Sequence, residues 1–340
     1  MLQERLPSQR MQHFRQRGLH ALSHAGGKDD NVHKPYSIRV NKMKKFITHD
    51  PLFSRTRALF LIVLLALLGA CSTIRFSYNH GDTLLYWWLD AYVDFEGDQS
   101  DWVKRDIGEL FQWHRKTQLH DYAALLATFQ RQLAANPTQA DLLADYRELR
   151  TRTETLAMKA VPDMVDLARS LTPDQIEQME KRFNKKNDEY RRKFVSGSVE
   201  KRNEARFDKS MDQFKLWFGA FSNEQEKALR RASDARPLDS NIWLEERIYR
   251  QRKILALARK IQQEKPNKEQ TGTMITSMLR EFFTRMDTPE RKGFYDSYIN
   301  ATSNFILTAI HIATPAQKAH AQKRMQGWIE DFNALAKEAK

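Results

Sequence analysis

Apolar residues recur every three or four positions from Asp82 to the end of the chain, and this spacing limits the fold more than any other feature. The first such stripe consists of Leu84, Leu85, Trp88, Tyr92 and Phe95. Residues with this spacing share one face of an α-helix. The sequence contains no sustained alternation of apolar and polar residues, the pattern of a half-buried strand. It therefore predicts an all-α protein, a multi-helix bundle of long amphipathic helices with no sheet.

The stripe and the residues that flank it predict helix boundaries. We expect Asp82 to cap a first helix and Gly97 to stop it, and Pro162 to kink a later helix. Further helices are expected at 99–117, around 122–133, and at 241–263, 267–287, 289–313 and 315–339. We expect 82–340 to form one all-helical domain, with two sub-bundles that divide near 222–240.

Five helix starts share one pattern, a side-chain oxygen that can cap free helix amides. Four of them continue with Pro and four place Gln at the third helical position, as in a capping box. The five starts are Asn136-Pro137-Thr138-Gln139, Thr172-Pro173-Asp174-Gln175, Ser222-Asn223-Glu224-Gln225, Thr288-Pro289-Glu290-Arg291 and Thr314-Pro315-Ala316-Gln317. With Leu171, the second resembles the Leu-Thr-x-x-Gln motif of Spy/CpxP-type periplasmic chaperones and stress sensors, which implies chaperone-like behaviour.

An apolar run from Ala58 to Cys71 ends on the only cysteine of the chain. As a helix, its roughly 13 apolar residues span only about 20 Å, less than the ~30 Å hydrocarbon core of a bilayer. That length is typical of a secretory signal, for which Lys44, Lys45, Arg55 and Arg57 supply the positive charges. Residues 1–42 are polar, and we interpret them as disordered or untranslated, with Met43 as the start of a compact leader.

The end of this run, Leu68-Gly69-Ala70-Cys71, resembles the lipobox of bacterial lipoproteins. The resemblance implies a signal peptide at 43–70, cleavage between Ala70 and Cys71, acylation of Cys71 and a lipidated tether at 71–81. Ser72 is not the aspartate linked in that family to inner-membrane retention. We therefore expect the periplasmic face of the outer membrane, with the inner membrane as the alternative. The competing interpretation of Cys71 is a buried cysteine after a core helix.

Removing the leader changes the charge balance. Residues 1–70 contain 12 Lys and Arg against 4 Asp and Glu, which leaves 44 against 39 in 71–340 and a net charge of about +5 instead of +13. The basic excess that could suggest nucleic acid lies mostly in the leader, so we expect no nucleic-acid partner.

The start of the expected domain is similar to a family of proteobacterial lipoproteins known as a domain of unknown function. The matching residues are Tyr78-Asn79, Leu85-Tyr86-Trp87-Trp88-Leu89-Asp90, Gln99, Trp102, Trp113-His114-Arg115 and Leu119. This resemblance supports the lipoprotein interpretation and implies no activity.

Two further patterns suggest contact surfaces. Phe207, Met211, Phe214, Phe218 and Phe221 follow an a/d spacing that favours a core, although a groove for unfolded clients would use the same residues. The candidate interaction residues are the aromatic-rich positions Trp87, Trp88, Trp113 and His114 and the basic positions Lys185, Lys186, Arg191 and Arg192. Such a basic face is usually solvated, and its functional interpretation is an anionic lipid headgroup or cell-wall carboxylate.

The motifs of common catalytic sites are absent from the sequence. We expect no cofactor and no metal, since helix and capping positions explain the acidic series between Asp90 and Asp101. The first hypothesis is a non-enzymatic, lipid-anchored envelope protein that binds an envelope protein, lipid or cell-wall component. The alternative is an envelope hydrolase with a site built from Asp90, Asp94, His114 and His120. A fold that gathers these side chains in one pocket would favour the alternative.

Overall fold

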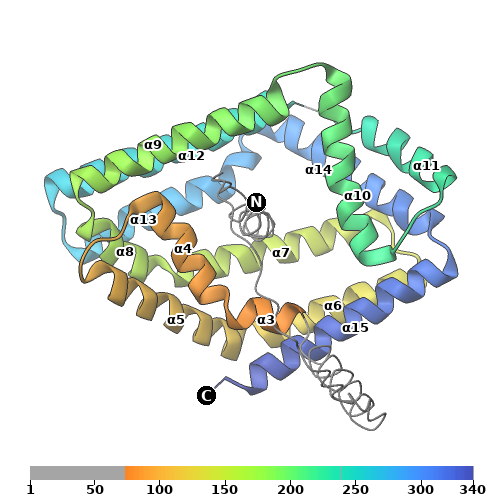
Figure 1. Ribbon diagram of the computed structural model, residues 1–340, viewed down its shortest axis with the longest axis horizontal. Coiled ribbons are helices and arrows are strands. Elements are labelled where there is room, and N and C mark those ends of the chain that lie inside the picture. Colours follow the sequence, from red (N-terminus) through yellow and green to blue (C-terminus); the bar gives the residue numbers. More distant parts are fainter. Residues whose placement is uncertain (1–72, 238, 340) are drawn as a thin grey trace, which may run out of the picture. The chain divides into compact units, whose positions relative to one another are not determined.

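The computed structural model describes residues 73–237 and 239–339, which contain helices and no strand (Figure 1). The expected leader at 1–42, the signal peptide at 43–70 and Cys71 lie outside the described residues. The first helices are α3 (Thr73–Asn79), α4 (Gly81–Val93), α5 (Gln99–Thr117), α6 (Leu119–Ala135), α7 (Gln139–Lys159), α8 (Val161–Ser170) and α9 (Pro173–Tyr190). After a π-helical turn at Arg191–Val195 follow α10 (Val199–Phe218), α11 (Asn223–Asp234), α12 (Ser240–Glu264), α13 (Lys268–Thr284), a 3-10 turn at Arg285–Asp287, α14 (Pro289–Ile312) and α15 (Pro315–Lys337).

The all-α fold is confirmed, and most predicted boundaries agree with the structure. The helix expected at 99–117 coincides with α5, and that expected at 241–263 extends by one residue at each end in α12. Within the described residues, no helix combines the length and the apolar character needed to cross a membrane.

Four boundary details differ from the prediction. The expected tether at 71–81 contains α3, and α4 follows after His80, whose carbonyl accepts a bond from the amide of Leu84. His80 is therefore the N-cap residue of α4, and Asp82 lies inside the first turn. Pro162 does not kink one helix but stands at the start of α8, after α7 has ended at Lys159. Asn136 ends α6 in the left-handed region, with a φ of 58°.

Three of the five predicted helix starts form the expected capping boxes, those at Thr172, Ser222 and Thr314. Near Asn136 the cap is Thr138, which forms a box with Asp141. Thr288 has the backbone of an N-cap residue but makes no side-chain capping bond.

Two pairs of glutamines join helix starts that are far apart in the sequence. Gln175, which is 2% exposed, donates to Gln99 Oε1 at 2.6 Å, and Gln99 donates back to Gln175 Oε1 at 3.3 Å. Each side-chain amide also donates to a backbone carbonyl that precedes the partner's helix. Gln175 donates to the carbonyl of Asp94, before α5, and Gln99 donates to that of Ser170, before α9, both at 3.1 Å. Each Oε1 accepts the backbone amide three residues earlier. The pair thereby fixes the start of α5 against the start of α9.

The second pair repeats this arrangement between α11 and α15. Gln225 donates to Gln317 Oε1 at 2.9 Å and receives a bond from Gln317 at 3.2 Å. Gln225 also donates to the carbonyl of Ile312, and Gln317 to that of Ala220, at 2.7 and 2.6 Å. The two glutamine pairs thus satisfy free groups at four helix starts.

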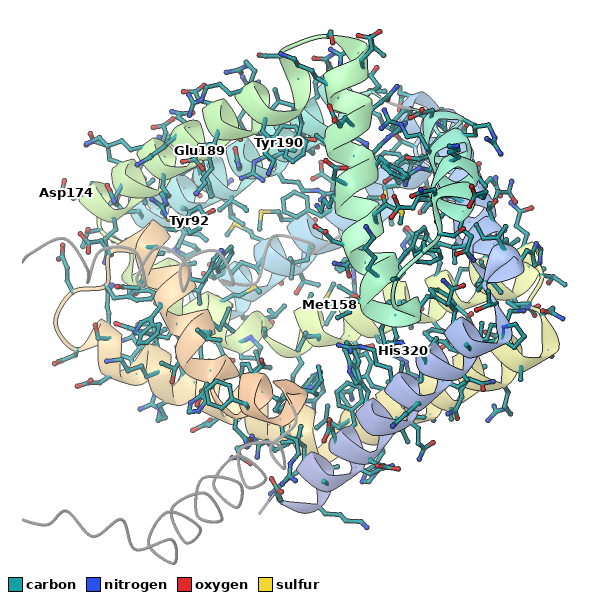
Figure 2. The ribbon with its side chains drawn as sticks, turned by 45° about the vertical axis from the view of Figure 1, so that its right-hand side comes forward. Tyr92, Met158, Asp174, Glu189, Tyr190 and His320 are labelled. Carbon is teal, nitrogen blue, oxygen red and sulfur yellow. The ribbon has the colours of Figure 1, made fainter. Side chains whose placement is uncertain are left out.

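The buried apolar residues form four clusters. The largest lies between α4, α5, α9 and α12 and contains Tyr92, which is labelled in Figure 2. The ring of Tyr92 lies 5.6 Å from that of Phe183 on α9. The second joins α6, α10, α14 and α15, the third joins α10, α11 and α14, and the fourth joins α6 and α15 with Tyr78 of α3. Neighbouring clusters share helices, and Ser72–Lys340 forms one compact unit. Around the expected division near 222–240, α10, α11 and α14 share one core.

The aromatic stripe of α10 lies in these cores, as the a/d spacing predicts. Met211, Phe214 and Phe218 are buried, and Phe207 and Phe221 pack against them. The Phe214 ring lies 4.9 Å from that of Phe305 on α14. The stripe is therefore not an open groove.

Replacing Phe214 with Ala should destabilise the protein by about 3–5 kcal/mol, because the change removes buried apolar area and leaves a cavity. Leu216→Ala is the matched control on the same helix, since Leu216 is 37% exposed and should lose less than about 1 kcal/mol. Urea unfolding measures both variants. Equal destabilisation of the two would contradict the core assignment.

Gln175→Ala should destabilise the protein by about 1–3 kcal/mol, because it removes a buried amide group and leaves the half-buried amide of Gln99 without its reciprocal partner. Gln178→Ala, at an exposed position one turn further along α9, should be near neutral. Thermal and urea unfolding compare the two. A neutral Gln175→Ala would mean that the glutamine pair does not hold α5 and α9 together.

Candidate functional site

His114 lies at the centre of an aromatic cluster where α3, α5, α6 and α15 meet. Its Nδ1 is 2.7 Å from the hydroxyl of Tyr78 on α3. On its other side the ring of Tyr122 from α6 lies 5.5 Å away, and Phe332 of α15 lies beyond it. Side chains of α3 and α6 thus contact the imidazole, and α15 packs behind Tyr122.

Burial keeps both hydrogen-bonded side chains uncharged. It lowers the pKa of His114 to about 4 and raises the pKa of Tyr78 to about 12. A general base works best with a pKa near the operating pH, so an imidazole with a pKa this low is poorly suited to the role at neutral pH. The hydrogen bond between Tyr78 and His114 therefore fits a structural contact better than catalysis.

Two arginines border this aromatic cluster. Arg115 lies 5.2 Å above the ring of Tyr78 and donates to Asn79 Oδ1 at 2.7 Å. Arg152 of α7 lies 5.8 Å from the ring of Tyr122 and pairs with Asp121 at 2.9 Å. Tyr78-Asn79 of α3 and His114-Arg115 of α5 therefore contact each other across the two helices.

The predicted hydrolase residues do not gather around His114. Asp90 Oδ1 accepts the amide of Phe95 at 3.0 Å, and Asp94 ends α4 in the left-handed region with a φ of 60°. Both stand near the start of α5. His114 is 15 residues along that helix from Gln99, or about 22 Å at 1.5 Å per residue.

His120 is also separate, because it is exposed and its Nδ1 lies 3.2 Å from Asn333 Oδ1 on α15. Across 73–237 and 239–339, no group of three or more His, Cys, Asp or Glu side chains is arranged to hold a metal ion.

The three candidate tryptophans occupy different environments. Trp113 is half-buried beside His114, with Lys159 Nζ 5.7 Å from its ring. Trp87 and Trp88 of α4 are 60% and 43% exposed. Trp88 was expected in the apolar stripe with Tyr92, and the structure corrects this: Tyr92 is buried, whereas Trp88 stands at the edge of that face.

The basic residues of α9 lie on a solvated face, several of them paired with acids of the same helix. Lys186 pairs with Glu189 and Arg191 with Asp188, both at 2.7 Å. Lys185 and Arg192 are exposed. Arg191 and Arg192 begin the π-helical turn that ends α9. Partial neutralisation by neighbours weakens the expectation of an anionic partner here.

This fold and site define an all-helical protein with buried polar contacts between helix ends and no assembled catalytic constellation among the described residues. The chain belongs to DUF6279, a family of unknown function, which matches residues 91–275, a little over half of the sequence. The family match includes Gln99, His114 and Gln175 but not Tyr78, Trp87 or Trp88. No curated protein and no solved structure matches the chain.

Acid should destabilise the protein through His114. Its folded pKa of about 4 is below the ordinary value of 6.5, so the unfolded chain binds the proton more readily and stability falls as pH drops from 6.5 toward 4. The loss that depends on His114 should reach about 2–3 kcal/mol near pH 4.

His114→Gln retains an acceptor for Tyr78 but does not titrate, so its stability should fall less over this range. His120→Gln, at an exposed position, should follow the wild type. Urea unfolding at pH 7, 5.5 and 4 gives the comparison. Parallel pH curves for wild type and His114→Gln would contradict the assignment.

Proposed function

We propose that this protein is a lipid-anchored, non-enzymatic helical protein of the bacterial envelope, attached to the membrane through acylated Cys71. The sequence Leu68-Gly69-Ala70-Cys71 at the end of a short apolar run carries the proposal. Because Ser72 is not the aspartate of inner-membrane lipoproteins, the proposed location is the periplasmic face of the outer membrane.

A binding or scaffolding role agrees better with the site than hydrolysis does. Burial keeps His114 neutral. Asp90 and Asp94 lie at the end of α4, near the start of α5, whereas His114 lies near the end of α5. A broad client-binding role gains no support from α10, because its aromatic stripe is buried. The proposed partner is therefore an envelope protein, a lipid or a cell-wall component bound at the surface of a preformed helical domain.

Replacing Cys71 with Ser should abolish incorporation of labelled fatty acid and leave an unprocessed precursor, because the side chain that accepts the diacylglyceryl group is lost. Ser72→Ala is the matched control and should still be labelled and processed, since it retains the cysteine. Metabolic labelling with palmitate, followed by gel analysis and mass spectrometry of the amino terminus, measures both. Equal labelling of Cys71→Ser and the wild type would refute lipid anchoring at this residue.

A further inference from the structure

The large exposed aromatic residues of the described chain are concentrated in α3 and α4. Phe76, Trp87 and Trp88 are 59%, 60% and 43% exposed. The other large exposed apolar side chains in 73–237 and 239–339 are aliphatic and lie on α7 and α10, at Leu149, Val199 and Leu216. Clustered exposed apolar residues mark interaction surfaces, whereas scattered single ones do not.

Phe76 lies on α3 and both tryptophans lie on α4, and the two helices are joined at His80, whose φ of −111° and ψ of 8° are not helical. The amide of His80 donates to the carbonyl of Phe76 at 3.2 Å, and that of Leu84 donates to His80 at 3.0 Å. Within α4, Thr83 and Trp87 are four residues apart and share one side of the helix, and Trp88 is about 100° around from Trp87, with its ring 5.1 Å from that of Tyr92. The rings of Phe76 and His80 are 4.6 Å apart. We call the exposed surface formed by Phe76, His80, Trp87 and Trp88 the aromatic face.

The opposite side of the same two helices is packed into the protein. Tyr86, Tyr92 and Val93 are buried in the largest core cluster, and Tyr78 bonds to His114. Helices α3 and α4 are therefore fixed by their inner side, and the aromatic face is directed away from the core. The face is part of the folded surface and not a loosely attached segment.

The position of the aromatic face in the chain indicates what covers it. Thr73, the first residue of α3, follows Cys71 by two residues, which span at most about 7 Å when fully extended. If Cys71 is acylated, as the proposed function states, α3 begins at the membrane surface. Tryptophan is enriched at the interface between lipid headgroups and acyl chains because its ring is apolar and its N–H is polar.

We propose that α3 and α4 lie along the surface of a phospholipid bilayer, with Phe76, Trp87 and Trp88 inserted at the headgroup level. This inference rests on the proposed lipid anchor and adds a second contact beside it. The aromatic face makes this contact by burying its rings and not through charge. Arg75, the basic residue beside it, pairs with Glu338, and the first turn of α4 contains the acidic residue Asp82. The domain would then be held in one orientation on the membrane.

Fluorescence quenching in vesicles tests the contact. The mature acylated protein is reconstituted into phosphatidylcholine vesicles that contain lipids spin-labelled near the headgroup, and tryptophan emission is compared with that in unlabelled vesicles. If the seven tryptophans emit equally, quenching of Trp87 and Trp88 should remove about two sevenths of the emission. The Trp87→Phe/Trp88→Phe variant should lose most of this quenching. Trp113→Phe, which removes a half-buried ring, should retain it.

Two outcomes would overturn the inference. Equal quenching of the wild type and the double variant would show that the aromatic face does not contact lipid. Self-association of the wild type in sedimentation experiments, lost in the double variant and without differential quenching, would assign the face to a second copy.

The acylation state of the same preparation is read by mass spectrometry. An acylated protein without differential quenching refutes only this inference, whereas absence of acylation refutes the proposed function. Circular dichroism confirms that each variant is folded.

Discussion

Reciprocal hydrogen bonds between glutamine side chains hold together the helix ends on which the fold depends. Each glutamine accepts the backbone amide three residues earlier through Oε1, which in Gln175, Gln225 and Gln317 completes a capping box, and each donates through Nε2 to a carbonyl before the partner helix. A carboxamide suits this position because one planar group has both a donor and an acceptor. Since Gln99 and Gln175 are 76 residues apart and Gln225 and Gln317 are 92 apart, the same chemistry serves local capping and long-range packing.

The sequence predicts the local half of this chemistry and not the long-range half. Helical periodicity locates α5 and α12 within a residue, and the start pattern identifies Thr172, Ser222 and Thr314 as caps, because both signals depend on neighbours within one or two turns. Which capping glutamines face each other depends on how the helices pack. No spacing within either motif contains that information.

The candidate site shows the same limit. The sequence marks His114 as a residue of interest but gives no sign that Tyr78, 36 residues earlier, bonds to it, or that burial keeps it neutral. Asp90 and Asp94 are close to His114 in sequence, but α5 carries His114 away from them. The periodicity places Trp88 in the apolar stripe with Tyr92. Trp88 lies at the edge of that stripe, where a large ring stays partly exposed.

The contact between α3 and α15 has a mechanical consequence. Arg75 of α3 pairs with Glu338, which ends α15, and α15 packs along α6 and against α10 (Figure 1). At the far end of this path His320 of α15 lies beside α10, with Nδ1 2.8 Å from the carbonyl of Trp217 (Figure 2). A pull applied at the amino-terminal side of Thr73 would therefore load the first and last helices together. Such a pull would be resisted first where α3 meets α15, at the Arg75–Glu338 pair and at the packing of Tyr78 against Leu335 and Ala336.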